Sequence, residues 1–73
     1  MRVRLTLHKK EHTRVHDALP MLHGAGAIEP SIRSSKNHEG PIELSFRLDD
    51  QLELSAVLAC AGLADLVPYA RKV

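Results

Sequence analysis

Two segments of the chain alternate apolar and polar residues with a period of two, and they constrain the fold most. They read RVRLTLH at 2–8 and IELSFRL at 42–48. Their apolar positions are Val3, Leu5 and Leu7 in the first segment and Ile42, Leu44, Phe46 and Leu48 in the second. A period of two places alternate side chains on opposite faces, so each segment is predicted to be a half-buried β-strand. Each apolar side then requires a second layer to cover it.

Helical spacing of apolar residues supplies that second layer. Val15, Leu19 and Leu22 recur at i, i+4 and i+7, with Ala18 beside them, and predict one helix. A second helix is predicted from the stripe formed by Leu54, Val57, Leu58 and Ala61. The glycines of GAG at 24–26, and Gly62, stand where glycine ends helices. The first helix begins near a cap at Thr13 or Asp17, and Pro20 either kinks it or lies in the first turn of a shorter helix.

The remaining segments complete a β-α-β-β-α-β order. A second strand is predicted around Ile28 and Ile32, on one shared face, followed by a turn at 36–41 and later by an extended segment at 66–71. This order predicts an α+β, ferredoxin-like two-layer sandwich over residues 1–73, one domain with a four-stranded antiparallel sheet and both helices on one face. In that topology strands 2 and 4 are the edges. Pro30 and Pro68 would fall in them and Pro41 at the start of strand 3, positions where proline is tolerated.

Length and composition exclude several classes of protein. A chain of 73 residues builds a small core, so self-association is an expected source of added stability. The lone Cys60 rules out an internal disulfide and is expected to be a small core residue. A net charge of +1 does not by itself indicate nucleic acid. The first residues do not resemble a signal peptide and no segment suits a membrane helix, so a cytoplasmic protein is expected. No cofactor is expected either.

The polar sides of the two alternating segments form the predicted outer surface of the sheet. This surface carries Arg2, Arg4, Thr6, Glu43, Ser45 and Arg47. RNA recognition by a sheet would require stacking aromatic residues there, whereas Phe46 points inward. A less favoured alternative is a DNA-binding regulator of the ribbon-helix-helix type. In that case Arg2, Arg4 and Thr6 would read the major groove, and EPSIRSS at 29–35 would begin its second helix.

The passages MLHGAGAIEPSIRSS, PIELSFRL and LADLVPYARKV resemble ACT-type regulatory domains in their spacing. The resemblance covers most of the chain. It implies a small regulatory or adaptor module that acts as a homodimer through protein contacts, binds a larger protein partner or a small effector, and is not an enzyme. The passage that corresponds to the family's entry into strand 2 gives four candidate ligand-binding residues: Gly24, Gly26, Ala27 and Ile28. The loop after strand 1 lacks the glycine that this family uses near its effector.

Three histidines stand four residues apart in HKKEHTRVHD at 8–17. His12 and His16 would share one helix face, and two imidazoles at that spacing can chelate Zn²⁺, Ni²⁺ or Cu²⁺. His8 is the third candidate ligand, with Glu11, Asp17 and His38 as further possibilities. Together they give a second alternative, a metal-binding or metal-responsive protein. The simpler interpretation, which we favour, is the solvated face of the first helix.

Overall fold

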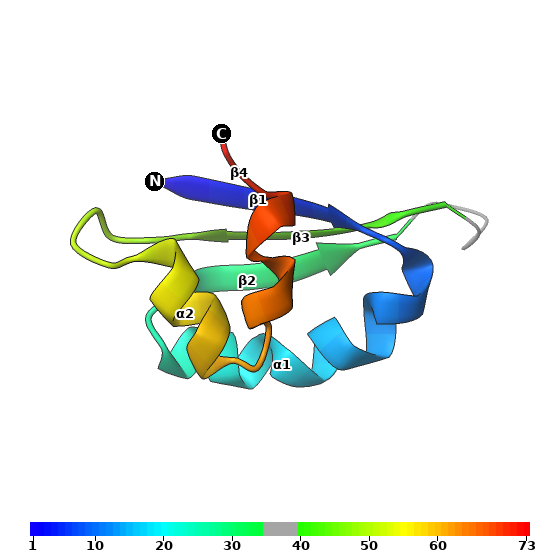
Figure 1. The fold of residues 1–73 in the computed structure, drawn as a ribbon, viewed down its shortest axis with the longest axis horizontal. Helices are drawn as coiled ribbons and strands as arrows, with labels where there is room; N and C mark the ends of the chain where they lie inside the picture. The colour runs from blue at the N-terminus through cyan, green and yellow to red at the C-terminus, as the bar shows by residue number, and fades with distance from the viewer. Residues whose placement is uncertain (35–39) are drawn as a thin grey trace.

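A computed structural model describes residues 1–34 and 40–73, and it contains a sheet with a helical layer on one side (Figure 1). The strands are β1 (Arg2–Leu7), β2 (Ile28–Arg33), β3 (Ile42–Arg47) and β4 (Ala70–Lys72). The helices are α1 (His12–Gly24) and α2 (Leu54–Cys60), with two 3₁₀ segments, η1 (Lys9–Glu11) and η2 (Ala64–Tyr69). Most of the turn predicted at 36–41 lies outside the described residues, as does His38.

The sheet has the order β2-β3-β1-β4, and every neighbouring pair is antiparallel. This confirms the predicted ferredoxin-like fold, with β1 and β3 central and β2 and β4 at the edges. Pro30 lies in the edge strand β2, and Pro41 comes immediately before β3. The proline positions therefore agree with the topology in two of the three predicted cases.

One aliphatic core fills the space between the sheet and the helices. Every apolar position predicted from the two alternating segments is buried, at 5 % exposure or less. The helical layer adds Val15, Ala18, Leu22, Val57, Leu58, Ala61, Leu63 and Leu66. Cys60 was expected in this core, but it is exposed, because Val57, Leu58 and Ala61 form the inward side of α2. Within residues 1–34 and 40–73, no helix has the length and apolar character needed to cross a membrane.

The start of α1 differs from the prediction. The helix begins at His12, directly after η1, and neither Thr13 nor Asp17 caps it. Instead, the Lys10 N–H donates to Nδ1 of His8 over 3.1 Å, which closes the preceding 3₁₀ turn. Pro20 lies inside α1, so the interpretation of a shorter helix that starts at Asp17 was wrong. The missing proline N–H is tolerated because Pro20 lies on the solvent side of α1, where water can satisfy the freed carbonyl.

Glycine ends both helices, as predicted. After α1, the Gly26 N–H donates to the His23 carbonyl and the Ala27 N–H to the Leu22 carbonyl, at 3.1 and 2.9 Å. This is the Schellman motif, and it requires the positive φ of 113° that Gly26 adopts. The same pair of bonds follows α2, where Gly62 has a φ of 74°. These two glycines set the direction in which the chain leaves each helix.

A β-bulge near the start of β2 overturns the prediction that Ile28 and Ile32 share a face. Ile28 pairs with Arg47, whereas Ser31 pairs with Ser45, so β2 contains one more residue than β3 over this stretch. Glu29 takes up the irregularity with a φ of 52°, which is unusual for a residue other than glycine. The extra residue reverses the alternation. Ile32 therefore packs against the core, while Ile28 lies on the opposite face and is 44 % exposed.

The C-terminal segment also differs from the prediction of an extended strand over 66–71. Residues Ala64–Tyr69 form η2, and β4 begins only at Ala70. Leu63 and Leu66 are both buried, and their spacing of three matches the three residues per turn of a 3₁₀ helix. Pro68 therefore lies in η2 and not in strand 4. The short α2 leaves part of the core uncovered, and η2 covers it.

Candidate functional site

The side of the sheet that faces away from the helices, here called the open face, presents its side chains in three rows across the strands. The strand pairing gives a first row of Ile28, Arg47, Arg2 and Val73, a second of Ser31, Ser45, Arg4 and Arg71, and a third of Arg33, Glu43 and Thr6. Five of the six arginines of the protein lie in these rows. The open face thus holds most of the arginine of the protein.

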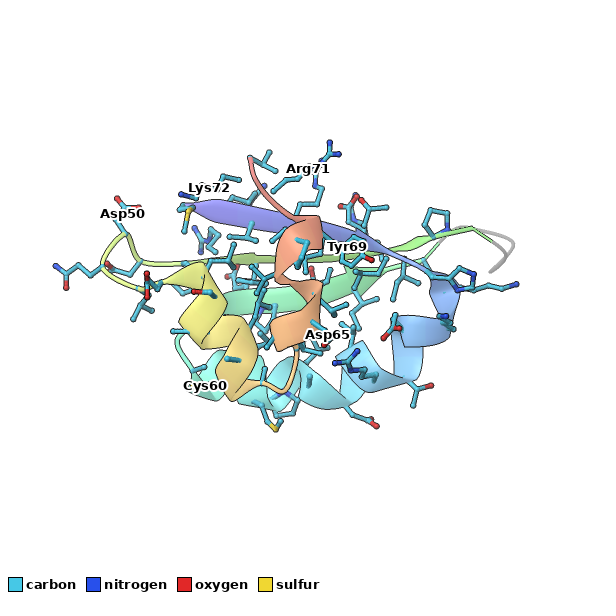
Figure 2. The ribbon with its side chains drawn as sticks, in the orientation of Figure 1. Asp50, Cys60, Asp65, Tyr69, Arg71 and Lys72 are labelled. Atoms are coloured by element: carbon cyan, nitrogen blue, oxygen red, sulfur yellow. The ribbon has the colours of Figure 1, made fainter. Side chains whose placement is uncertain are left out.

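Four of these arginines form two like-charged pairs on neighbouring strands. Arg2 is the direct partner of Arg47, and Arg4 is the direct partner of Arg71. We call these four residues the arginine quartet. Figure 2 shows Arg71 projecting from β4 on the side opposite α1 and α2. Like charges directly opposite each other destabilise a sheet, so this arrangement opposes the fold and is not explained by stability.

Two glutamates partly neutralise the quartet. Arg4 Nε lies 3.2 Å from Glu43 Oε1, and Arg47 Nη2 lies 3.6 Å from Glu29 Oε2. The Arg4–Glu43 contact joins the two central strands, β1 and β3. Each like-charged pair therefore has one arginine held by a carboxylate and one that is not. Among the described residues, the other arginines of the open face, Arg2, Arg33 and Arg71, form no ion pair.

Charge is distributed unevenly between the two sides of the molecule. Five arginines and two glutamates give the open face a net charge of +3, although the whole chain carries +1. The difference leaves −2 for the rest of the protein. Among the described residues, the three rows contain no lysine, because Lys9 and Lys10 lie in η1 and Lys72 is the partner of Val3 on the other side of the sheet. Lys72 still lines the second depression, next to Arg71.

The open face is shallowly hollowed between β1, β2 and β3. A depression of about 220 Å³ is lined by residues that include Arg2, Arg33 and Arg47. At its floor the hydroxyl oxygens of Ser31 and Ser45 lie 3.2 Å apart in a hydrogen bond. Arginine and serine supply hydrogen-bond donors here, which suits an anion that contacts the sheet from above.

Tyr69 stands where β4 meets η2, at the margin of the open face. A second depression is lined by Arg4, Thr6, Tyr69 and Arg71. Tyr69 is 57 % exposed, and Ile28 and Val73 are exposed at the two ends of the first row. Apolar and aromatic groups therefore flank the arginine quartet.

The residues predicted to bind a small ligand lie at the junction of α1 and β2. Gly24 ends α1, Gly26 and Ala27 form the Schellman motif, and Ala27 is buried. A Cβ on Gly26 would lie 2.6 Å from Leu52 Cδ1. The Leu52 side chain therefore fills the space beside this glycine. Ile28 alone of the four reaches the open face. Ligand binding at this junction stays a prediction.

The three candidate metal ligands are divided between two elements. His12 and His16 lie on α1 as predicted, with their rings stacked 6.0 Å apart between centroids and exposed to solvent. His8 precedes η1, and its Nδ1 already accepts a hydrogen bond. In the part of the chain that the structure describes, no three histidine, cysteine, aspartate or glutamate side chains are grouped so that they could hold one metal ion. The metal hypothesis therefore rests on His12 and His16.

Arg14 joins the helical elements by a contact that the sequence patterns do not indicate. Its Nη1 donates to Asp65 Oδ2 over 2.9 Å, and its Nη2 donates to the Gly62 carbonyl over 2.9 Å and to Asp65 Oδ1. The hydrogen bonds that Arg14 donates to Asp65 lower the pKa of that carboxyl. The hydrogen bonds that Arg14 donates to Asp65 and Glu11 raise the pKa of the guanidinium. This bidentate pair ties α1 to the start of η2.

Three of the open-face arginines were predicted on the polar sides of the central strands, but only Arg2 and Arg4 were named as binding residues. Arg33 and Arg71 were missed because both lie in edge strands that lack a clear alternating pattern. The like-charged pairing was missed as well, since it depends on register. Two closely spaced arginines in the first strand were the signal available in the sequence.

The placement of β1 bears directly on the ribbon-helix-helix alternative. The major groove of DNA admits a two-stranded β-ribbon. Here β1 has β3 on one side and β4 on the other, so neither of its edges is free. Residues Ile28–Arg33, which include most of the segment expected to begin a second helix, form β2. Arg2, Arg4 and Thr6 nevertheless point outward together, as that hypothesis requires.

Comparison with known proteins adds no relative to this description. No protein-family model, no curated protein and no solved structure matches the chain. The resemblance to ACT-type domains stays a prediction.

Proposed function

We propose that this protein is a small non-enzymatic adaptor that binds an anionic partner with the open face of its sheet. The observation that carries the proposal is the arginine quartet, which places two like-charged pairs side by side on a solvent-facing sheet. An anion above the sheet would relieve the repulsion within both pairs, and it would form the charge-assisted hydrogen bonds that guanidinium groups make with carboxylates or phosphates.

The edges of the sheet offer a weaker alternative to the open face. β4 is only three residues long, and β2 carries both the bulge at Glu29 and Pro30, which cannot donate to a further strand. Short strands, bulges and prolines all discourage the addition of another strand. The open face is therefore the better-suited binding surface.

Charge also bears on self-association. Two copies that met through their open faces would bring a net +3 against a net +3, which opposes such contact. The homodimer predicted from the sequence stays part of the proposal only if it forms through another surface. Measurement of the mass in solution, with and without the partner, would show whether the adaptor acts as one copy or two.

Binding to simple polyanions tests the proposal. Fluorescence anisotropy would measure the affinity for labelled poly-L-glutamate and for a labelled DNA duplex at about 50 mM salt, where electrostatic binding is readily detected. A double variant, R2Q/R71Q, removes two positive charges from the open face. The matched control, K9Q/K10Q, removes two positive charges from η1.

We expect wild type and the lysine control to bind at least one of the two polyanions, and the arginine variant to lose most of that affinity. Failure of both polyanions to bind wild type, or an equal loss in the two double variants, would refute the proposal. Thermal melts of the two variants would show that both remain folded.

A further inference from the structure

We infer that the open face binds an extended acidic segment of a partner protein, laid along β1; this inference rests on the proposed function. It assigns the chemical class of the anionic partner, and it follows from the type, the spacing and the surroundings of the arginines. The partner is a polypeptide whose alternate side chains are glutamate or aspartate.

The type of cation favours a ligand with planar anionic groups. Every positive residue in the three rows is an arginine, although the described chain also contains three lysines. Arginine presents a planar fork that donates two parallel hydrogen bonds to one carboxylate, whereas lysine acts as a point charge. In each like-charged pair, Glu29 or Glu43 already holds one arginine through its carboxylate. The free arginine of each pair, Arg2 or Arg71, is left for a carboxylate of the partner.

The spacing of the rows favours an extended chain. Arg2 and Arg4 are alternate residues of β1, so their Cα atoms are about 6.6–6.8 Å apart. Alternate side chains on one face of any extended polypeptide have the same separation. An acidic strand that runs along β1 would therefore place one carboxylate over the Arg2–Arg47 pair and the next over the Arg4–Arg71 pair. The next position along β1 is Thr6, whose direct partner Glu43 opposes a third carboxylate there, so the predicted contact covers two carboxylates.

The surroundings of the quartet are those of a protein interface. Ile28 and Val73 are exposed at the two ends of the first row, and Tyr69 is exposed beyond Arg71. Protein interfaces are enriched in arginine and tyrosine and depleted in lysine, and apolar residues commonly anchor them. Such residues would contact the apolar part of a polypeptide on either side of its carboxylates.

Nucleic acid fits the same face less well. No aromatic residue lies in the three rows, so successive bases have no stacking platform. The net charge of the whole chain is only +1, which gives little long-range attraction for a polyphosphate. Glu29 and Glu43 lie among the arginines and would repel a dense row of phosphates more strongly than isolated carboxylates.

The test compares probes of equal charge and different spacing. The first is a labelled peptide of alternating glutamate and threonine, which favours an extended strand. The second has the same composition, with its glutamates in one block followed by its threonines. Single-stranded and duplex DNA oligonucleotides complete the set, all measured by anisotropy at about 50 mM salt. We expect the alternating peptide to bind most tightly.

Variants then locate the contact. Loss of a charge-assisted hydrogen bond should weaken binding of the alternating peptide by about tenfold or more in R2Q and in R71Q. K9Q should bind like wild type, and a thermal melt of R2Q separates weak binding from unfolding.

Each other outcome overturns the inference in a distinguishable way. Tighter binding of either DNA probe would assign nucleic acid as the partner and would leave the proposed anion-binding adaptor intact. Equal affinity for the alternating and block peptides would exclude the row-by-row contact with an extended segment. No binding to any probe would overturn the inference and the proposed function together.

Discussion

Removing one arginine from a like-charged pair should make the protein more stable. Arg2→Gln keeps most of the aliphatic stem of the side chain and removes the charge directly opposite Arg47. A cross-strand pair contributes about 0.2–1 kcal/mol, and like charges are unfavourable by similar amounts. Because Glu29 already offsets part of the charge of Arg47, we expect a gain near the lower end, about 0.2–0.5 kcal/mol.

Thermal unfolding provides the assay. For a domain of this size, about 1 kcal/mol shifts the melting temperature by about 4–8 °C, so Arg2→Gln should melt roughly 1–4 °C higher than wild type at low salt. The gain should disappear at about 1 M salt, where the screening length falls to about 3 Å. Arg33→Gln is the matched control, because its cross-strand partner is Glu43 and not another arginine. That variant should gain nothing and lose a little.

Two results would refute this reasoning. If the guanidinium groups of Arg2 and Arg47 splay apart in solution, Arg2→Gln would be neutral, and its melting temperature at low salt would equal that of wild type. A gain that is the same at low and high salt would show that something other than charge repulsion was relieved. Either result would show that the arginine quartet carries no repulsion for a bound anion to relieve, and that repulsion is the basis of the proposed anion binding.

Three further predictions concern other parts of the molecule. Gly26→Ala should destabilise the fold by about 1–2 kcal/mol in a denaturant titration, because φ is 113° and the new Cβ would meet Leu52. Gly24→Ala, in open space at the end of α1, should stabilise it by about 0.5–1 kcal/mol, and a similar effect of both changes would contradict this account. Because its pKa is lowered in the folded state, Asp65 contributes stability that is complete above its unfolded pKa and is lost as the pH falls through its folded pKa. Asp65→Asn should therefore reduce the fall of the melting temperature at acidic pH, and an unchanged fall would show that the Arg14 contact contributes nothing. Calorimetry with Zn²⁺ and Ni²⁺ should detect only weak chelation, and the H12A/H16A double variant should abolish it. Tight binding, or binding that the double variant retains, would require ligands other than His12 and His16.

Much of the fold could be predicted because its central elements have strong periodicity. The strands β1 and β3 alternate without interruption, and the apolar stripes of the two helices have clear spacing. Pro30 fitted an edge strand independently of that pattern. These signals depend only on which face of an element is buried, and the spacing of apolar residues along the sequence indicates that face.

The differences arose where conformation depends on neighbours. The bulge at Glu29 uses a positive φ in a residue that has no particular preference for it, so nothing in the local sequence indicated that Ile28 would turn outward. The helical form of η2 did leave a signal in the spacing of Leu63 and Leu66, but the segment at 66–71 was predicted to be extended. The candidate site was predicted only in part, because pairing between strands, and not the sequence of either strand, sets Arg2 against Arg47 and Arg4 against Arg71.

The shortness of β4 has a consequence for how binding and unfolding are linked. Arg71 is held in place by three paired residues at the end of the chain, where β4 contacts only β1 in the sheet. Such a segment opens at a lower free energy than the central strands, and each opening withdraws Arg71 from the quartet. A partner that contacts Arg71 must therefore also hold β4 closed. Amide hydrogen exchange at residues 70–73 should slow when the acidic segment binds, and it would report occupancy of the site from the backbone.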